Sequence, residues 1–243
     1  MDGDRDVDMD GDTDGDRDKG LDEDGDKGKA ISRALGAGKK EDKEMSITTA
    51  TVTISGVTPY SQSSNPTLHP DYERVLKEAK CAKNDHALRE SLTWKFRARF
   101  DDAGNVIIPN MAFYGALVSG MRYTGDKIPG QRNKTWADKF RRGLYVENDV
   151  VLPYTMDTIQ GMQLFVPSDG KKGGSSKVLK IFPVMQEWGG TFSVRILDNI
   201  ITQDVFAQAV TVAGSFVGLG RWRPEKEGMN GRFDMTNLKW KVD

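Results

Sequence analysis

Two long stretches of helical periodicity, set among strand-like segments, constrain the fold of this chain more than any other feature. Residues 110–123 and residues 202–217 each place apolar side chains on one helical face, and Thr202 is suited to cap the second stretch. Strand-like segments cover residues 49–55, 93–100, 144–152, 191–197 and 232–242. Reduced to its core elements, the order is strand, helix, strand, strand, helix, strand, with insertions.

The insertions include one long predicted hairpin. Residues 162–166 and 178–182 form its two arms, and residues 167–177, rich in Gly, Ser and Lys, form its tip. Together with the order of the core elements, this predicts an α+β fold with a ferredoxin-like (RRM-like) core and an inserted long β-hairpin. Because this architecture carries many functions, the function has to be inferred from particular residues.

The first 44 residues differ in composition from the rest of the chain. Residues 1–29 are mostly Asp, Gly, Lys and Arg, with Val7, Met9 and Leu21 as the sizeable apolar side chains. Such a segment cannot bury enough apolar surface to offset the loss of backbone entropy on folding. We therefore predict a disordered acidic low-complexity tail over residues 1–44 and one folded domain over residues 45–243.

The Asp-rich repeat of this tail does not have the spacing of an EF-hand. Asp6, Asp8 and Asp10 could supply the first three ligands, and Gly11 the required turn, but the twelfth position is then Arg17. An EF-hand needs a bidentate Glu at that position. We expect neither a bound metal nor any other cofactor, and the tail is interpreted as solubilising or as competing with a polyanionic partner.

The charge of the chain is divided unevenly between tail and domain. Residues 1–44 hold 16 of the 36 acidic and 9 of the 35 basic side chains, which leaves 20 acidic and 26 basic side chains in residues 45–243. The predicted domain therefore carries a net charge of about +6. This balance is compatible with a polyanionic partner, and equally with a mixed solvated surface.

The sequence lacks the features of several classes of protein. The single cysteine, Cys81, cannot form an internal disulfide or a cysteine-rich zinc site. The acidic N-terminal residues do not resemble a signal peptide, and no apolar run is long enough to span a bilayer. We therefore expect a protein of a reducing compartment with no membrane partner.

Residues suited to catalysis are scarce. His69 and His86 are the only histidines, and neither has metal-ligand spacing or an obvious catalytic partner. The sequence contains no nucleophile elbow, no phosphate-loop lysine motif and no cluster of paired carboxylates. We expect the protein not to be an enzyme.

A glycine- and arginine-rich loop after the second long helix gives the strongest functional signal. Glycine lets backbone approach a ligand and exposes amide donors, arginine matches phosphate geometry, and tryptophan offers a face for base stacking. The alternative is a helix C-cap followed by a loose turn. The candidate binding residues in this loop are Gly218, Gly220, Arg221, Trp222, Arg223, Gly231 and Arg232.

Two further groups of cations are candidates for the same interface. The tip of the predicted hairpin carries Lys171, Lys172 and Lys177, and could either reach across a bound strand or be an exposed turn. The predicted strand over residues 93–100 turns Lys95, Arg97 and Arg99 to one face, which would suit either phosphate binding or a protected sheet edge. Grouped with this face are Arg132, Lys134, Lys139, Arg141 and Arg142.

The order of elements and the loop motifs resemble the RAMP superfamily, which includes the backbone subunits of CRISPR effector complexes. The matching pieces are Gly-Leu-Gly-Arg at residues 218–221 and Gly-Arg-Phe at residues 231–233, between the second helix and the last strand. The resemblance implies head-to-tail self-assembly along single-stranded RNA or DNA, with the hairpin in the place of a thumb. It departs from the family at Glu225 and Glu227, whose negative charges oppose phosphate binding.

The sequence also looks like small uncharacterised proteins of tailed phages and prophages. Residues 58–62, 165–170 and 218–233 carry that likeness. It brings little functional knowledge, but it is consistent with a cytoplasmic protein of a bacterium or a phage-infected host.

The leading hypothesis is a sequence-tolerant binder of single-stranded RNA or DNA that forms homo-oligomers along the strand. A second hypothesis is a phage structural protein that assembles without nucleic acid. A third is an RNA-processing endonuclease that uses His69 or His86.

Overall fold

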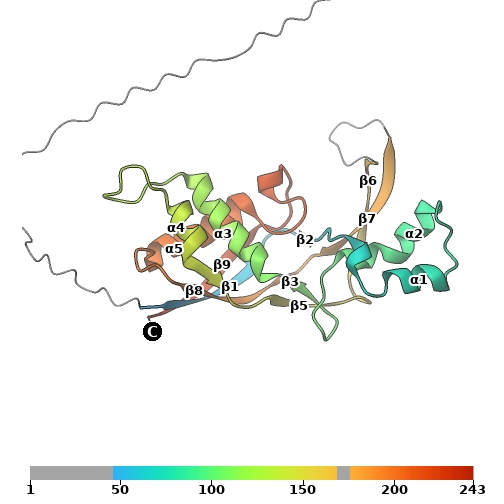
Figure 1. Cartoon of the computed structure of the whole chain (residues 1–243), viewed down its shortest axis with the longest axis horizontal. Helices are drawn as coiled ribbons and strands as arrows, with labels where there is room; N and C mark the ends of the chain where they lie inside the picture. Colours follow the sequence, from blue (N-terminus) through green and yellow to red (C-terminus); the bar gives the residue numbers. More distant parts are fainter. Residues whose placement is uncertain (1–45, 169–175, 243) are drawn as a thin grey trace, which may run out of the picture. The chain divides into compact units, whose positions relative to one another are not determined.

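The computed structural model of the chain describes residues 46–168 and 176–242. The acidic tail predicted over residues 1–44 lies outside the described residues, and so do Lys171 and Lys172 of the hairpin tip. Figure 1 shows how the helices and strands of the described residues are arranged.

A four-stranded antiparallel sheet forms the centre of the domain. Its strands, in spatial order, are β4 (Leu144–Val146), β8 (Gly189–Ile196), β1 (Thr48–Gly56) and β9 (Phe233–Val242). Along β1 every second side chain from Thr48 to Ile54 is buried. This period of two is that of a strand with one face in the core, and the β-branched residues of β1 favour its extended backbone.

Two helices, α3 (Asn110–Thr124) and α5 (Gln203–Val212), lie on one face of this sheet (Figure 1). Thr202 caps α5, as the sequence predicts. Gly120 allows the helices to approach closely, because a Cβ there would lie 3.2 Å from the Ala209 carbonyl oxygen. Phe113 of α3 stacks on Phe192 of β8 with 4.2 Å between ring centroids, so helices and sheet share one core.

Two smaller sheets complete the strand arrangement. One contains β2 (Tyr60–Ser61), β7 (Lys177–Met185) and β6 (Gln160–Pro167), and the other pairs β3 (Asn105–Ile108) with β5 (Val150–Thr155). β6 and β7 are the hairpin expected from the sequence, and they pair in antiparallel register. Phe182 and Met185 of β7 are buried, so the base of the hairpin belongs to the core.

Three shorter helices lie outside the two long ones: α1 (Tyr72–Glu78), α2 (His86–Thr93) and α4 (Trp136–Gly143). α5 continues into a π-helix over Ala213–Val217, which ends at Gly218 with a positive φ of 72°. The mixture of helices and antiparallel sheets confirms the α+β class. Among the described residues, none of the helices is long and apolar enough to cross a membrane.

The strand predicted over residues 93–100 is wrong. The chain there leaves α2 and forms a 3-10 helix over Trp94–Arg97, and only Phe100 makes a bridge, to Val106. The 3-10 turn shortens the distance to α2, so that Arg97 reaches Glu90 at 2.8 Å. If residues 93–97 were extended, the four steps from Thr93 to Arg97 would span about 13 Å, compared with about 8 Å in a 3-10 helix.

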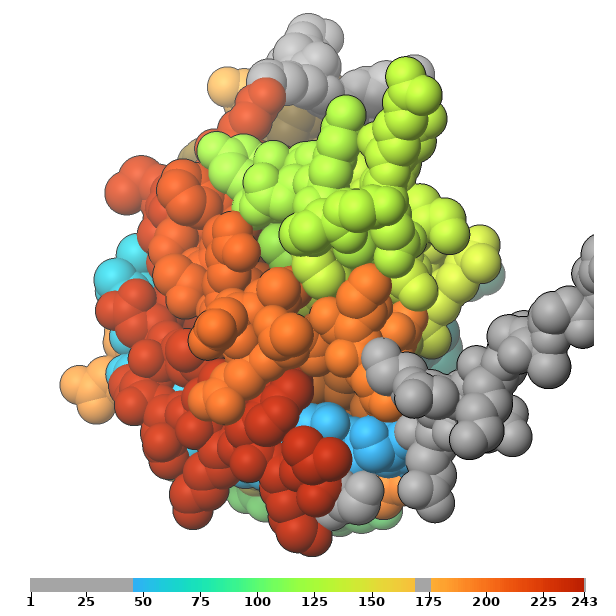
Figure 2. All heavy atoms as spheres, turned by 90° about the vertical axis from the view of Figure 1, so that its left-hand side faces the viewer, coloured from blue at the N-terminus to red at the C-terminus, as the bar shows by residue number. Residues whose placement is uncertain are grey.

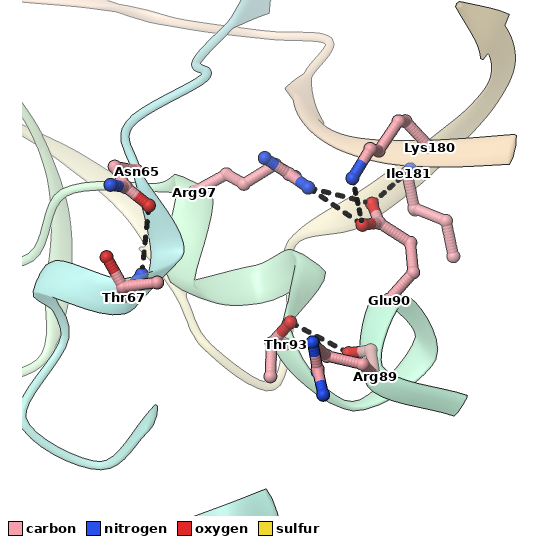
Figure 3. Close-up of polar contacts among 8 residues, drawn as sticks. All are labelled: Asn65, Thr67, Arg89, Glu90, Thr93, Arg97, Lys180 and Ile181. Carbon is pink, nitrogen blue, oxygen red and sulfur yellow. Dashed lines mark hydrogen bonds and ion pairs between the residues drawn. The ribbon is translucent and has the colours of Figure 1, made fainter. Parts of the chain in front are cut away.

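Glu90 explains this departure, because it gathers three donors in a nearly dry site (Figure 3). Its side chain is 10% exposed, and it accepts hydrogen bonds from Arg97, Lys180 and the backbone amide of Ile181. The last two donors belong to β7. A single carboxylate of α2 therefore joins this helix, the 3-10 turn and the base of the hairpin.

The single strand predicted over residues 144–152 is also wrong, because it is divided into β4 and β5. Polar side chains at the break make contacts with neighbouring elements. Glu147 pairs with Arg195 at 2.6 Å, and Asp149 accepts a hydrogen bond from the Asn110 amide at the start of α3. The apolar alternation is interrupted at the break, where Glu147, Asn148 and Asp149 are consecutive polar residues and Asn148 is exposed.

Candidate nucleic-acid interface

A cleft of about 1260 Å³ lies beside the glycine- and arginine-rich loop. The loop contributes Arg221 and Trp222, the 3-10 segment and its continuation contribute Phe96 and Arg99, and His69 closes another side. The beginning of α3 also lines the cleft. Segments that lie far apart in the sequence therefore form one concave surface, which is the usual form of a ligand site.

Gln62 organises the floor of this cleft from a buried position. Its side-chain nitrogen donates to the Tyr60 hydroxyl at 2.9 Å and to the Ile107 carbonyl at 2.7 Å. Its side-chain oxygen accepts from the backbone amide of Arg99 at 2.6 Å. These bonds fix three segments around the cleft, and Gln62, directly after β2, thereby positions Arg99 at the edge of the cleft.

The loop over residues 218–231 is held firmly by backbone hydrogen bonds. The Arg221 amide donates to the Ser61 carbonyl at 2.7 Å, and the Gly231 amide donates to the Pro59 carbonyl at 2.8 Å. Within the loop, the Asn230 amide donates to the Trp222 carbonyl at 2.9 Å. The loop is therefore fixed to residues 59–61, which include β2, and it is not a loose turn.

The glycines of the loop allow close packing of backbone on backbone. A Cβ at Gly220 would collide with the Ser61 carbonyl oxygen, and one at Gly231 with the Leu219 carbonyl oxygen. Gly218 is similarly crowded by Pro224. Their positive φ values of 72–74° are also those that favour glycine. Internal packing thus accounts for the three glycines that the sequence assigned to ligand contact.

The replacement Gly231→Ala is expected to lower the free energy of unfolding by about 3 kcal/mol, because it adds a collision to the cost of a positive φ. Gly104→Ala is the matched control, since Gly104 has a φ of 82° but open space around the added methyl group. The control should cost about 1 kcal/mol. Urea denaturation of both variants measures the difference, and equal losses would contradict the packing role.

Trp222 occupies an uncommon backbone conformation for a large side chain. Its φ is 61°, and 46% of its surface is exposed at the cleft. Gly228 makes this possible, because a Cβ there would collide with the Trp222 carbonyl oxygen. Strain of this kind persists only where the surrounding structure enforces it, and it is concentrated at functional sites. The result is an exposed indole face fixed at the edge of the cleft.

Arg221 lies beside this indole in an unusual environment for a cation. Its guanidinium carbon is 3.5 Å from the centroid of the Phe182 ring and 5.0 Å from that of the Trp222 ring. Within residues 46–168 and 176–242, its buried NH1 nitrogen has no hydrogen-bond partner, and the side chain forms no ion pair. The charge is stabilised mainly by two aromatic faces.

The electrostatics of this position favour a bound anion. Burial lowers the pKa of the Arg221 guanidinium, and the nearby positive charge of Arg97 lowers it further. Arg97 lies on the same ring, with its guanidinium carbon 5.3 Å from the centroid of Phe182. An anion at Arg221 would reduce both the cost of desolvation and the repulsion between the two cations.

The side chains of the other two arginines of the loop are engaged in contacts within the protein. Arg223 is engaged with Glu225 at 2.6 Å and with the Gly220 carbonyl. Burial raises the pKa of Glu225, but hydrogen bonds from Arg223 and Ser119 outweigh it and hold that pKa below its usual range. Arg232 donates instead to the Ser215 carbonyl. Arg221 and Arg223 both line the cleft, whereas Arg232 does not, so the structure removes one of the three arginines from the predicted group.

The predicted basic row is divided in the same way. Arg99 is exposed and lines the cleft, whereas Arg97 is paired with Glu90 behind it. Lys95 lies over the Trp94 ring at 5.8 Å. Because these residues follow a 3-10 turn rather than a strand, their side chains do not share one face.

A separate basic surface is formed by the segment before α4 and by α4 itself, and Figure 2 shows this segment projecting beside α5. Lys139 pairs with Asp198 at 2.7 Å, and Arg141 pairs with Asp138 at 2.5 Å. Arg132, Lys134 and Arg142 are exposed. These residues are therefore not part of the cleft, contrary to the grouping in the sequence analysis. Lys177, at the start of β7, is exposed as well.

Neither histidine lies in a catalytic arrangement within the described residues. His69 stacks on Phe96 with 4.1 Å between centroids, and its Nδ1 accepts a hydrogen bond from the Asp71 amide at 3.2 Å. His86 begins α2 and is exposed. Among the described residues, no group of three or more His, Cys, Asp or Glu side chains could hold a metal ion.

Sequence reasoning missed Phe182, Gln62 and Lys226 as parts of this site. Phe182 was assigned to a hairpin arm, and nothing in a strand pattern indicates that an arginine stacks on one of its residues. Acidic side chains were missed too, since Asp101, Asp102 and Asp149 line the cleft. The lining of the cleft therefore carries both acidic and basic side chains.

Comparisons with known proteins do not assign this chain to a family. No protein-family model matches the chain, and no curated protein sequence matches it. Among solved structures 82 chains match. One is from a cryo-EM structure of the type III-B Cmr-beta bound to cognate target RNA, at 14% sequence identity and a TM-score of 0.47, covering 81% of this chain. The chain spans 61% of the length of that structure's chain, and the RAMP resemblance stays a prediction.

Proposed function

We propose that this protein binds single-stranded nucleic acid in the cleft, with a phosphate at Arg221 and a base on Trp222. The observation that carries this proposal is the partly buried guanidinium of Arg221, which has no ion pair among the described residues and lies over the rings of Phe182 and Trp222. A buried cation without a carboxylate is costly in the free protein. An anionic ligand offsets that cost. The arrangement therefore favours the binding of an anion at the expense of the stability of the free protein.

Single-stranded nucleic acid fits this site better than other anions. A small anion would use Arg221 but not the exposed indole of Trp222, and a duplex keeps its bases stacked away from such a face. Arg99 and Lys226 also line the cleft and can bind further phosphates.

Trp222→Ala is expected to weaken binding of a labelled single strand by about 5- to 100-fold, because it removes the stacking surface for one base. Trp222→Phe is the matched control and should retain most of the affinity. Fluorescence anisotropy measures both variants, with a duplex of the same sequence as competitor. Equal affinity of the wild-type protein for single strand and duplex would argue against recognition by stacking.

The topology supports a more specific proposal about the fold. In chain order the strands of the central sheet are β1, β4, β8 and β9, with α3 between the first two and α5 between the last two. Their spatial order β4-β8-β1-β9, antiparallel throughout, is the arrangement of a split βαβ unit. We therefore infer a ferredoxin-like core into which the cleft-forming segments and the hairpin are inserted.

Assembly of several copies along one strand stays a prediction. The mass of the complexes, measured by mass photometry with strands of increasing length, should rise in steps of one protein copy.

The absence of catalysis is likewise a proposal, supported by the engaged Nδ1 of His69. The wild-type protein is therefore expected not to cleave a labelled single strand, and a cleavage activity that is lost in a His69→Ala, His86→Ala double variant would favour the endonuclease alternative.

A further inference from the structure

A second pair of stacked aromatic rings lies on the surface away from Trp222. Tyr123, in the last turn of α3, and Phe216, in the π-helix, stack with 5.0 Å between centroids and an interplanar angle of 16°. They are 63% and 50% exposed. Two large aromatic side chains exposed together form a flat apolar surface that the fold itself does not cover.

The segment from Phe216 to Lys226 follows α3 and connects this pair to the cleft. Met111 and Ala112, near the start of α3, line the cleft with Trp222. Glu225 accepts a hydrogen bond from Ser119 in the middle of α3, and Phe216 reaches Tyr123 near the end of the helix. The loop therefore lies beside successive turns of one helix, from the cleft to the aromatic pair.

The exposed side of α3 forms the floor of this path. Met111, Gly115 and Tyr123 are exposed and Ser119 is half-buried, and their spacing of four residues places them on one stripe of the helix. Between Ala112 and Tyr123 the helix rises about 16 Å. At about 3.4 Å per stacked nucleotide, this corresponds to about five nucleotides.

The charges around the aromatic pair suit a polyanion. Arg122 and Lys127 are exposed on either side of Tyr123 in the sequence, and Lys226 lies at the cleft end of the path. Of the acidic groups nearby, Glu225 is paired with Arg223, and Asp126, which accepts a hydrogen bond from the neutral Gln208 at 3.1 Å, keeps its charge. With three cations and one carboxylate that is unpaired among the described residues, the charge along the path is positive on balance.

We propose that Tyr123 and Phe216 form a second stacking platform for the same single strand that occupies the cleft. This inference rests on the proposed function and extends it, because it sets the direction and the length of the bound strand. The strand leaves the cleft at Trp222, follows α3 and places a base against the exposed aromatic surface, with phosphates at Arg122 and Lys127. Aromatic stacking tolerates any base, so this platform adds affinity without sequence preference.

The test uses the full chain and oligothymidylates of about 4 and about 10 nucleotides, which are shorter and longer than the path. In the wild-type protein the longer strand should bind at least about tenfold more tightly. Tyr123→Ala and Phe216→Ala should each remove most of this gain while leaving the affinity for the short strand unchanged. Tyr145→Ala is the matched control, since Tyr145 is 56% exposed on β4 and outside the path.

The outcomes separate the two proposals. Normal binding of the short strand by all variants, with the length gain retained in Tyr123→Ala and Phe216→Ala, would overturn the second platform but not the cleft. Failure of the wild-type protein to bind either strand would overturn both. If Tyr123→Ala instead reduced self-association in sedimentation experiments and left the length gain intact, the pair would be a contact between copies and the inference would be wrong.

Discussion

Arg221→Met should weaken binding of a single-stranded oligonucleotide by about 10- to 100-fold, because it removes charge-assisted hydrogen bonds to a phosphate. The same variant should be as stable as the wild-type protein or more stable. Methionine keeps an unbranched side chain against Phe182 and Trp222, and it removes a buried charge that has no ion pair among the described residues. The replacement therefore lowers the affinity for the strand without lowering the free energy of unfolding.

The control for this prediction is Arg195→Met. Arg195 lies on β8, pairs with Glu147 and is exposed, so its replacement should change neither property greatly. Anisotropy and thermal unfolding of the same preparations measure both quantities. A marked loss of stability in Arg221→Met would show that this arginine is a structural residue, and the binding data would then lose their meaning.

Glu90→Ala is expected to lower the free energy of unfolding by about 3–5 kcal/mol, because it leaves two cations without their carboxylate in a nearly dry site. Arg97 is 11% exposed and would be the more costly of the two to leave unpaired, since Lys180 is 38% exposed. Urea denaturation followed by tryptophan fluorescence measures this loss. The effect should also reach the cleft, because Arg97 and Arg221 share the Phe182 ring.

A double-mutant cycle measures the interaction energy between Glu90 and Arg97 separately from the contribution of each side chain. The Glu90→Leu, Arg97→Met double variant replaces the buried ion pair by apolar side chains, and it should be much closer to wild-type stability than Glu90→Ala. If the two single replacements were additive, the ion pair would contribute nothing beyond its separate side chains, and the structural role given to Glu90 would be wrong.

The elements with strong periodicity could be predicted from the sequence, and those fixed by a single polar contact could not. The long helices, the first and last strands and the hairpin follow from apolar patterns over many residues, and the structure contains each of them. The 3-10 turn at Trp94–Arg97 depends on one carboxylate, Glu90, which the alternating sequence does not reveal. The division between β4 and β5 falls at the polar residues 147–149, where Asp149 accepts a hydrogen bond from the Asn110 amide at the start of α3.

The candidate site could be predicted only in part, for a related reason. The sequence indicated the loop with Arg221 and Trp222, because glycine, arginine and tryptophan stand close together in it. It could not indicate that Arg223 is held by Glu225 or that Arg232 bonds the Ser215 carbonyl, since both partners are determined by the folded loop. The stacking of Phe182 on Arg221 joins residues from separate elements and has no local signal.

The most direct test of the central claim is fluorescence anisotropy of the full chain with a labelled single strand, over a salt series. The account predicts tight binding at low salt, with a logarithm of the association constant that falls linearly with the logarithm of salt concentration. The slope should be about −0.7 for each phosphate contacted, and it should become shallower by about one contact in Arg221→Met. Absence of binding to single-stranded DNA and RNA at low salt would contradict the account.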